Sequence, residues 1–410
     1  MGLGMNDDVY ALCEYNGELY AGGKFTTADG APANHIAKWD GAGWVTVGNG
    51  LNGNVWSLAV YNGELYAGGF FLNYGWGILR WDGSNWYDVG GGVNDLVYSL
   101  CVYHGKLFVG GKFTSAVTIQ ANHIAQWDGV SWDTLGSGTG GLSPWVLALT
   151  TYNGKLIVGG EFTSTGGQAS HYISSWNDTA WIPMGFSTTT ENWPHGVYAL
   201  CSYNNNLYAG GYLDTIGLIH VTNNMGEWNG LTWNSFGLNL NGYVYTLITD
   251  SIKLYVGGNF GTPGHYVTSW DGNTYSNFGT GMNAFVTAFT FYNSHLYGGG
   301  KFTLAGSNTA KKIAWWSVPL AVDEFSDQNE ISFYPDPNDG NMTFVLSGAS
   351  NQNRKLEFYN SVGQLVDVIN IENAEERISI NESVFENGIY VYHLIADGET
   401  VETGKIVIAK

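Results

Sequence analysis

One short stretch, Leu19-Tyr-Ala-Gly-Gly-Lys-Phe25, returns in varied form along most of this chain of 410 residues. Aligning the copies on the second glycine of the pair gives seven positions: Gly23, Gly69, Gly111, Gly160, Gly211, Gly258 and Gly300. Their spacing is 42 to 51 residues. A period of this length indicates a repeat architecture, in which each unit buries its apolar faces against its neighbours.

Each copy contains two signals for a β-hairpin. In the first copy, the apolar and aromatic runs Val9–Tyr15 and Glu18–Phe25 flank Asn16-Gly17, whose residues tolerate the positive φ angles of a tight turn. A second pair of runs, 35–39 and 44–48, flanks an Asp-Gly turn. Each copy therefore predicts a four-stranded antiparallel meander.

Such a sheet is apolar on both faces and cannot bury them alone. Radial stacking of the copies would bury both faces, whereas a linear solenoid would leave strand edges unprotected. The 59 glycines and the aromatic content of 15% also suit an all-β protein with many tight turns. We therefore expect residues 1–318 to form a seven-bladed β-propeller with four-stranded blades.

Six copies carry two aromatic residues five positions apart. The pairs are Trp39 and Trp44, Trp81 and Trp86, Trp127 and Trp132, Trp176 and Trp181, Trp228 and Trp233, and Trp270 and Tyr275. With the Gly-Gly pair, this spacing resembles the kelch-type blade of galactose oxidase-like propellers. We expect the aromatic columns to pack blade against blade, and the Asp of the Trp-Asp-Gly motif to be a turn residue and not a metal ligand.

The seventh copy is incomplete, because no fourth-strand pattern follows Trp316. At the other end, Met1–Asn6 matches the tail of a fourth strand, as in Val47–Asn52. We expect the N-terminal segment to close the last blade, which otherwise lacks a strand. We also expect that residues upstream of Met1, including a signal peptide, are missing from this sequence.

The composition changes after the repeats. All 17 tryptophans lie between Trp39 and Trp316. A polar linker at 319–330 follows, and residues 331–410 then show short alternating strands at the spacing of a small Ig-like β-sandwich.

This last segment resembles the type A C-terminal sorting domain of the bacterial type IX secretion system. The matching residues are Tyr334, Pro335, Asp336, Pro337, Gly340, Gly363, Gln364, Gly388, Tyr390 and Lys405. The resemblance implies that the type IX machinery is a partner. It also implies periplasmic transit, and then a propeller that is secreted or attached to the outer-membrane surface. The alternative is an ordinary accessory sandwich.

Charge and hydropathy exclude several partners. The net charge of -20 repels nucleic acid and anionic lipid, and no apolar run reaches the roughly 18 residues that a transmembrane segment needs. Cys13, Cys101 and Cys201 occupy the same repeat slot, so they are expected to be small core residues and not disulfide partners. We expect a monomer.

No pattern in the sequence predicts a catalytic residue, a metal site or a cofactor. A copper oxidase would need a tyrosine–cysteine pair and two converging histidines, but the cysteines lie in repeat slots. The histidines His35, His123, His171 and His265 recur near the start of the third strands, which favours a repeat consensus. A carboxylate pair for glycoside hydrolysis stays open, since such pairs are defined by their separation in space.

The copies differ most in the loops between strands two and three, which share a rim with the connections from strand four to the next blade. Aromatic residues lie there outside the structural columns: Trp76, Trp145, Trp193, Tyr243 and Phe285. Variable loops on a rigid scaffold usually carry recognition. We therefore predict a non-catalytic binding or adhesion module for an extracellular glycan or protein. The alternatives are a polysaccharide hydrolase or lyase on the same rim, and a surface-layer role without a specific ligand.

Overall fold

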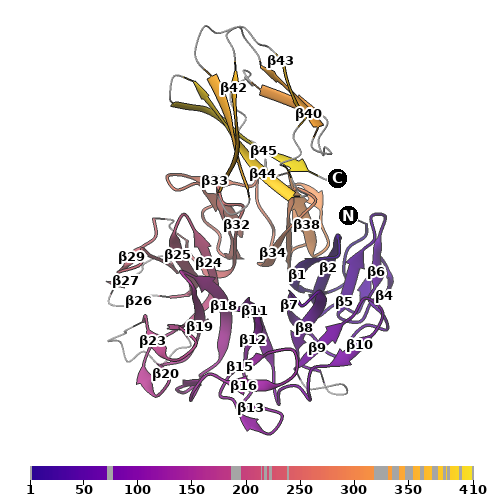
Figure 1. Cartoon of the computed structure of the whole chain (residues 1–410). Coiled ribbons are helices and arrows are strands. Elements are labelled where there is room, and N and C mark those ends of the chain that lie inside the picture. The colour runs from indigo at the N-terminus through magenta and orange to yellow at the C-terminus, as the bar shows by residue number, and fades with distance from the viewer. Residues whose placement is uncertain are drawn as a thin grey trace. The chain divides into compact units, whose positions relative to one another are not determined.

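The computed structural model contains only β-strands and connecting segments among the residues that it describes (Figure 1). Those residues are 2–71, 77–185, 195–213, 215–216, 219–220, 224–237, 240–317, 331–334, 341–346, 354–360, 364–371, 377–381, 385, 388–396 and 399–408. Over these ranges, no helix long and apolar enough to cross a membrane is found. The chain divides into two compact units, Met1–Leu320 and Ala321–Lys410.

The first unit contains seven antiparallel sheets, each built from one repeat. The first three have the orders β1 (Val9–Tyr15), β2 (Glu18–Gly23), β5 (Ile36–Trp39), β6 (Trp44–Thr46); β7 (Val55–Tyr61), β8 (Glu64–Gly69), β9 (Ile78–Trp81), β10 (Trp86–Asp88); and β11 (Val97–Tyr103), β12 (Lys106–Gly111), β15 (Ile124–Trp127), β16 (Trp132–Thr134). The next three are β18 (Val146–Tyr152), β19 (Lys155–Gly160), β22 (Ile173–Trp176), β23 (Trp181–Pro183); β24 (Gly196–Tyr203), β25 (Asn206–Tyr212), β28 (Met225–Trp228), β29 (Trp233–Ser235); and β30 (Tyr243–Thr249), β31 (Leu254–Asn259), β32 (Val267–Trp270), β33 (Tyr275–Asn277). The seventh is β34 (Val286–Tyr292), β35 (His295–Gly300), β38 (Ile313–Trp316).

In five of these sheets, a short hairpin lies between strands two and three. They are β3–β4 (Thr27–Ala28 and Ala31–Pro32), β13–β14 (Ser115–Ala116 and Ile119–Gln120), β20–β21 (Ser164–Thr165 and Gln168–Ala169, with β17, Thr139–Gly140), β26–β27 (Thr215–Ile216 and Ile219–His220) and β36–β37 (Leu304–Ala305 and Asn308–Thr309). In these five sheets, the loop between strands two and three therefore has a hairpin core, around which the sequences vary.

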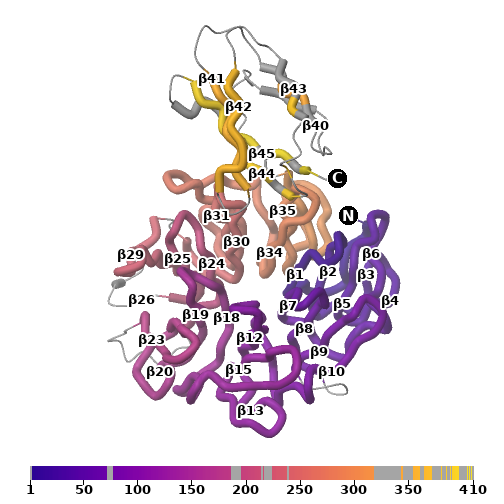
Figure 2. Tube along the Cα trace, in the orientation of Figure 1, coloured from indigo at the N-terminus to yellow at the C-terminus, as the bar shows by residue number. Residues whose placement is uncertain are grey.

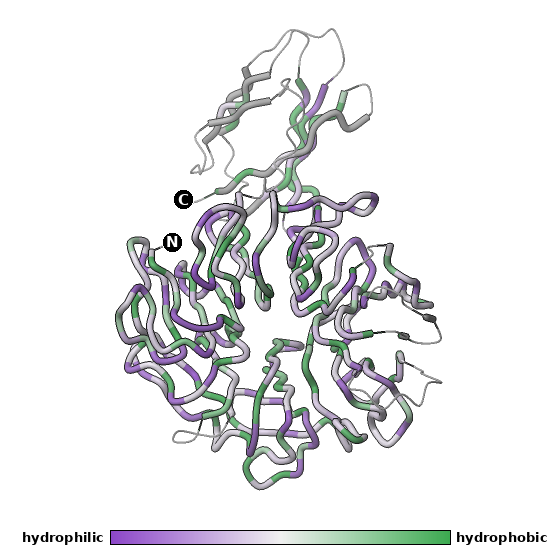
Figure 3. The backbone as a smooth tube through the Cα atoms, turned by 180° about the vertical axis from the view of Figure 1, so that it is seen from behind, coloured by the Kyte–Doolittle hydropathy of each residue, from purple (hydrophilic) through white to green (hydrophobic). Residues whose placement is uncertain are grey.

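The seven sheets surround a common centre, with the first strand of each sheet innermost, and the unit is a β-propeller (Figure 1). The ring closes between the last sheet and the first, where Thr287 Oγ1 donates a hydrogen bond of 2.5 Å to the carbonyl oxygen of Val9. Hydrophobic residues run along the strands (Figure 3), and the cores lie between sheets. Ile36 and Val47 of the first sheet, for example, pack with Leu65 and Trp81 of the second.

The Gly-Gly pair is explained by a β-bulge that recurs in every sheet. In the first sheet Val9 pairs with Gly23 and Ala11 with Gly22, so Tyr10 is left without a partner in the ladder. A Cβ on Gly23 would lie 2.1 Å from the carbonyl oxygen of Asp8, and one on Gly22 would lie 2.4 Å from Cγ1 of Val55 in the next sheet. The second glycine therefore permits the bulge, and the first permits close packing between sheets.

Two further kinds of hydrogen bond join neighbouring sheets. The indole Nε1 of Trp132 donates to the carbonyl of Val89 at 2.9 Å, and Trp86, Trp181 and Trp233 make the equivalent bond to the sheet before theirs. The hydroxyl of Tyr103 donates to the carbonyl of Gly154 in the next sheet at 2.9 Å, as the equivalent tyrosines of other sheets do. The prediction that the aromatic columns pack between sheets is confirmed for the tryptophans but is wrong for Tyr275, which is exposed. The tyrosine links were not predicted.

The Asp of the Trp-Asp-Gly motif has the predicted role in a turn. Asp40 Oδ1 accepts hydrogen bonds from the backbone N–H groups of Ala42 and Gly43 at 2.9 and 2.8 Å. These bonds hold the pKa of the Asp40 carboxyl below its usual value. Asp82, Asp128 and Asp271 make the same contacts.

The seventh sheet has three strands in the described part of the chain, and the N-terminal segment lies beside it (Figure 2). Met5 N donates to the carbonyl of Lys311 at 3.1 Å, as Leu51 N does to Asn34 in the first sheet. Residues 2–6 therefore occupy the place that follows a fourth strand and not the strand itself. The counterparts of Trp44 donate to the end of the preceding fourth strand, but Trp44 Nε1 is buried with no partner among the described residues.

The second unit contains two antiparallel sheets. One has the order β39 (Ile331–Tyr334), β40 (Asn341–Leu346), β43 (Arg377–Asn381), and the other has the order β42 (Leu365–Ile371), β41 (Arg354–Tyr359), β44 (Gly388–Ala396), β45 (Glu399–Ile408). Phe344 and Ile380 of the first sheet share one hydrophobic core with Leu356, Phe358 and Leu394 of the second.

The substitution Gly23→Ala should lower the free energy of unfolding by about 1–3 kcal/mol, since overpacking of a filled site costs about that much. The matched control is Gly237→Ala, because a Cβ at that position meets nothing within 4 Å. Urea unfolding followed by tryptophan fluorescence measures both variants. Equal losses of stability would contradict the explanation of the glycine pair.

Fusing a copy of residues 43–46 (Gly-Trp-Val-Thr) directly before Met1 should stabilise the unit, because it supplies a fourth strand to the seventh sheet in the register of Val47–Asn52. The gain should be about 1 kcal/mol or more if Trp44 Nε1 also receives an acceptor. The control fusion, Gly-Trp-Pro-Thr, carries a proline that disrupts the ladder. Identical unfolding midpoints for the two fusions would count against this closure.

Candidate ligand-binding site

Three of the predicted aromatic residues lie in one structural slot. Trp145, Tyr243 and Phe285 each stand directly before the valine that opens the bulge of an inner strand, and each is partly buried. Tyr245 contacts both Tyr243 and Phe285, with ring centroids 6.3 and 6.1 Å apart, so these two join one cluster. Trp145 lies on another sheet. Trp76 and Trp193 lie outside the described residues.

The bulges create a ring of side chains that the sequence analysis did not single out. The seven residues in the bulges are Tyr10, Trp56, Tyr98, Leu147, Tyr198, Tyr245 and Thr287, here called the bulge ring. Six of them line a central cavity of about 220 Å³, whose other walls come from the inner strands. A signal was present in the sequence, because an aromatic residue follows the valine in five of the seven copies.

The aromatic members of the bulge ring form two arcs. Tyr10 and Trp56 are stacked, with centroids 4.2 Å apart and an interplanar angle of 3°, and Trp56 meets Tyr98 edge-on at 5.6 Å. Tyr198 and Tyr245 stack at 6.1 Å. Leu147 and Thr287 are the non-aromatic members. All seven side chains are half-buried, so their remaining surface is available to a ligand.

The residue after each Gly-Gly pair lies on the rim where the bulges are. These residues, here called the bridging slot, are Lys24, Phe70, Lys112, Glu161, Tyr212, Asn259 and Lys301. Lys112 Nζ lies 5.0 Å from the ring centroid of Trp145, and Lys301 Nζ lies 5.6 Å from that of Phe285. Lys301 also pairs with Asp8 at 3.5 Å, and Lys24 with Asp7 at 3.3 Å.

Glu161 is the acidic member of the bridging slot. Burial raises the pKa of its carboxyl to about 7, and a hydrogen bond with the side chain of Tyr198 only partly offsets this effect. Gly196, at the slot that Trp145 and Tyr243 fill on other sheets, leaves the room that Glu161 uses. A Cβ on Gly196 would lie 2.8 Å from Glu161 Cγ.

Two hydroxyls that line the central cavity have no hydrogen-bond partner among the described residues. Ser57 Oγ and Ser99 Oγ are buried and make no hydrogen bond. Because an unpaired buried hydroxyl is costly, these groups are suited to bind water or a polar ligand atom.

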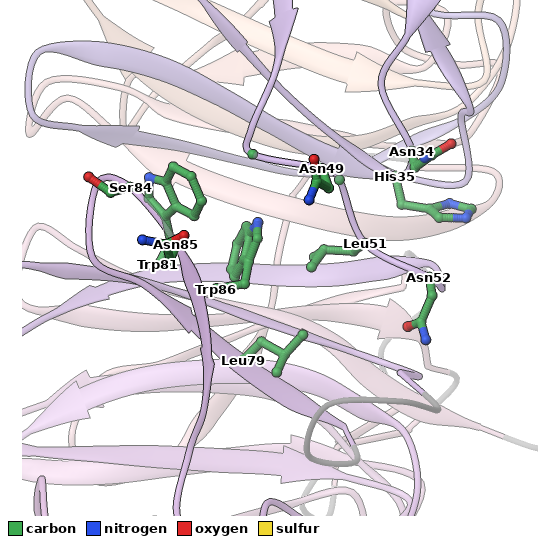
Figure 4. Close-up of a pocket in the computed structure, with 12 residues that line it drawn as sticks. Asn34, His35, Asn49, Leu51, Asn52, Leu79, Trp81, Ser84, Asn85 and Trp86 are labelled. Carbon is green, nitrogen blue, oxygen red and sulfur yellow. The ribbon is translucent and has the colours of Figure 1, made fainter.

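A second concave site lies between the outer parts of the first two sheets (Figure 4). It has a volume of about 670 Å³ and combines the indoles of Trp81 and Trp86 with polar side chains of Asn34, Asn49 and Asn85. Trp86 already donates its indole N–H to the carbonyl of Val47, and Trp81 is only 7% exposed. Both indoles therefore serve mainly to join the two sheets.

The histidines and cysteines of the described residues were candidates for metal binding and for thiol chemistry. Across the described ranges, no group of three His, Cys, Asp or Glu side chains could hold a metal ion. His35 and His123 occupy a left-handed backbone position before the third strand, with φ of 64° and 68°, where Tyr172 and Lys312 stand in other sheets. Cys13, Cys101 and Cys201 are free thiols.

Comparison with known proteins identifies the C-terminal segment. Residues 332–409 match the family model of the secretion system C-terminal sorting domain, and residues 153–173 match that of a domain of unknown function (DUF5122) beta-propeller. The first match indicates secretion by the type IX system to the cell surface or extracellular space. No curated protein matches the chain.

Similar solved structures are distant. The computationally designed Ika8 protein is 14% identical with a TM-score of 0.46, over 99% of this chain and 98% of that one. The extracellular domain of BT4673 from B. thetaiotaomicron is 14% identical with a TM-score of 0.47, and the match covers 98% of this chain but 56% of that one. A fungal alcohol oxidase of the AA5 family, in complex with copper, is 14% identical with a TM-score of 0.48, over 100% and 98% of the two chains. At these TM-scores the likenesses carry no argument about activity.

Several of the predicted sorting residues lie within the described part of the second unit. Tyr334 ends β39, Gly388 begins β44, Lys405 lies in β45, and Tyr390 is 7% exposed in the core. Gln364, directly before β42, donates its backbone N–H to Asn360 Oδ1 at 2.9 Å. Pro335, Asp336, Pro337, Gly340 and Gly363 lie outside the described residues.

The three thiols should be unreactive in the folded protein. Burial raises the pKa of each to about 12, so at pH 8 the thiolate fraction is on the order of 10⁻⁴. An aromatic disulfide reagent added at pH 8 should label none of them within minutes, and all three after unfolding in urea. Rapid labelling of the folded protein would contradict the assignment of these residues to the core.

Proposed function

We propose that this chain is an exported, non-catalytic binding or adhesion module that takes an extracellular glycan or protein at the bulge ring. The propeller would have seven kelch-like blades over residues 1–318. Residues 331–410 would form an Ig-like sorting domain behind the linker 319–330. The observation that carries the proposal is the set of five half-buried aromatic side chains in the repeated bulges, four of which line one central cavity.

The chemistry of the bulge ring supports this function. Aromatic faces stack on the apolar faces of sugar rings and on protein side chains, and they lose little conformational entropy on binding. Trp145, Tyr243 and Phe285 extend the aromatic surface at the neighbouring rim positions. Ser57 and Ser99 add polar groups without partners to the cavity wall.

The sorting domain gives this module its location. We propose that Tyr334, Gln364, Gly388, Tyr390 and Lys405, with the sorting residues outside the described ranges, are read by the type IX machinery during export. The propeller would then act as a monomer, either free or attached to the outer-membrane surface.

A polysaccharide hydrolase or lyase is the second candidate, and one observation favours it. A carboxyl with a pKa of about 7, such as Glu161, suits a general acid or base at neutral pH. Catalysis predicts product from soluble glycans that is lost in the variant Glu161→Gln, whereas the binding function predicts no product from either protein.

The binding function is tested by screening the full chain against a glycan array and an array of matrix proteins. For any ligand found, Trp56→Ala and Tyr245→Ala should each weaken binding at least about tenfold, which corresponds to about 1.4 kcal/mol. The matched control is Tyr275→Ala, because Tyr275 is 53% exposed on an outer strand. No ligand on either array, or equal losses from Tyr275→Ala and Tyr245→Ala, would contradict the proposal.

A further inference from the structure

Three of the seven residues in the bridging slot are lysines, and their contacts show which groups surround an ammonium ion there. Lys112 and Lys301 place Nζ within 5.0 and 5.6 Å of an aromatic centroid on the rim, and Lys301 and Lys24 pair with rim carboxylates. An aromatic face and a carboxylate both stabilise an ammonium ion. At three of the seven positions, therefore, this slot holds a cation against the groups that favour it.

On the fourth sheet, the bridging slot carries a carboxylate in place of an ammonium group. Its bridging residue is Glu161, which shares a hydrogen bond with Tyr198, and Tyr198 lies within electrostatic range of Tyr212, Tyr243 and Tyr245. Among the residues that the structure describes, no lysine or arginine pairs with Glu161. Here the carboxylate and the aromatic rings are both present, and no ammonium group of the described residues pairs with them.

The same position lacks the side chain that the other sheets carry there, and the side chains of Glu161 and Tyr198 meet beside it. Gly196 stands where the other sheets carry Asp8, Asn54, Leu96, Trp145, Tyr243 and Phe285. A Cβ there would lie 2.8 Å from Glu161 Cγ and 3.0 Å from Tyr198 Cε1. On the fourth sheet, the bulge residue is Leu147 and not an aromatic residue. Leu147 is smaller than the tyrosines around it and lines the central cavity.

We propose that Glu161, Tyr198 and Tyr245 form a binding site for a primary ammonium group on a slender aliphatic stem, as in the lysine side chain of a protein ligand. This inference rests on the proposed binding function and names the ligand chemistry of one part of the site. The lysine side chains of Lys24, Lys112 and Lys301 occupy the equivalent slot on other sheets, which favours the same aliphatic stem over the ring of an amino sugar.

The site should bind more tightly as pH rises through neutrality. Burial holds the carboxyl of Glu161 partly protonated, with a pKa of about 7, and a nearby ammonium ion favours the charged form. Affinity is therefore low where the carboxyl is protonated, below about pH 6, and reaches its maximum above about pH 8. The other titratable groups that face this region are Tyr98 and Asp95 at β11, His195 and Tyr198 at β24, Tyr212 on β25, and Tyr243 and Tyr245 on β30.

The experiment is calorimetric titration of the full chain with acetyl-Gly-Lys-Gly-amide between pH 5.5 and 8.5, beside the norleucine peptide and glucosamine. We expect the lysine peptide to bind, the norleucine peptide to bind at least about tenfold more weakly, and affinity for the lysine peptide to rise across the range. Binding of glucosamine without the lysine peptide would overturn the assignment of the ligand.

Two variants test the role of Glu161. Glu161→Gln keeps the side-chain shape and should weaken binding of the lysine peptide at least about tenfold and remove its pH dependence, while Glu161→Lys should block the site with the protein's own ammonium group. The control is Glu14→Gln, an exposed glutamate near the opposite end of the inner strand. A pH dependence that persists in Glu161→Gln would assign the effect to His195 and overturn the proposal.

The two proposals fail differently. If array ligands bind and depend on Tyr245, but the lysine peptide does not bind, the ammonium site is wrong and the binding module stands. If the lysine peptide binds as expected while no array ligand is found, the ammonium site stands and the broader function is wrong. Unchanged thermal unfolding of Glu161→Gln would exclude misfolding as the cause of any loss.

Discussion

The structure depends on the close approach of two backbones at the glycine pair. Only a residue without a Cβ allows the carbonyl of Asp8 to lie against Gly23, and the same contact recurs at every Gly-Gly position. This approach forces one extra residue into each inner strand, and the extra residue turns out of the hydrogen-bonded ladder. The most repetitive element of the sequence thus creates a position whose side chain can take part in binding, because a bulged residue does not take part in strand pairing.

The links between sheets leave this position free to vary. At the outer edge, the tryptophan of a fourth strand donates to the preceding sheet. At the end with the Asn-Gly hairpin, a tyrosine donates to the next sheet's turn. The end with the bulges carries neither link, so its contacts can be ion pairs, cation–π pairs or aromatic stacks without loss of the ring. Structural and recognition roles are therefore separated along the length of each strand.

The sequence predicts the repeated strands well because hairpin turns and core residues are local patterns. Asn16-Gly17 defines one turn, and the five-residue spacing of Trp39 and Trp44 places both side chains at the turn between the third and fourth strands. The bulge ring was missed for a physical reason. Whether Tyr10 pairs or bulges depends on the register of two strands, and by simple alternation it reads as an ordinary strand residue. The rim prediction reached Trp145, Tyr243 and Phe285 because loop variation is visible without knowledge of register.

Glu161 illustrates the same limit at the level of chemistry. In the sequence it is one acidic residue among 35, after one Gly-Gly pair of seven. Its raised pKa arises from the burial that its fold position imposes, and its room arises from Gly196, which is 35 positions later and on the next sheet. No local pattern joins these two residues. In a ring of repeats, the residues that make one site different from the others come from neighbouring copies. Comparison of equivalent positions around the ring therefore identifies such a site. The spacing of residues within one copy does not.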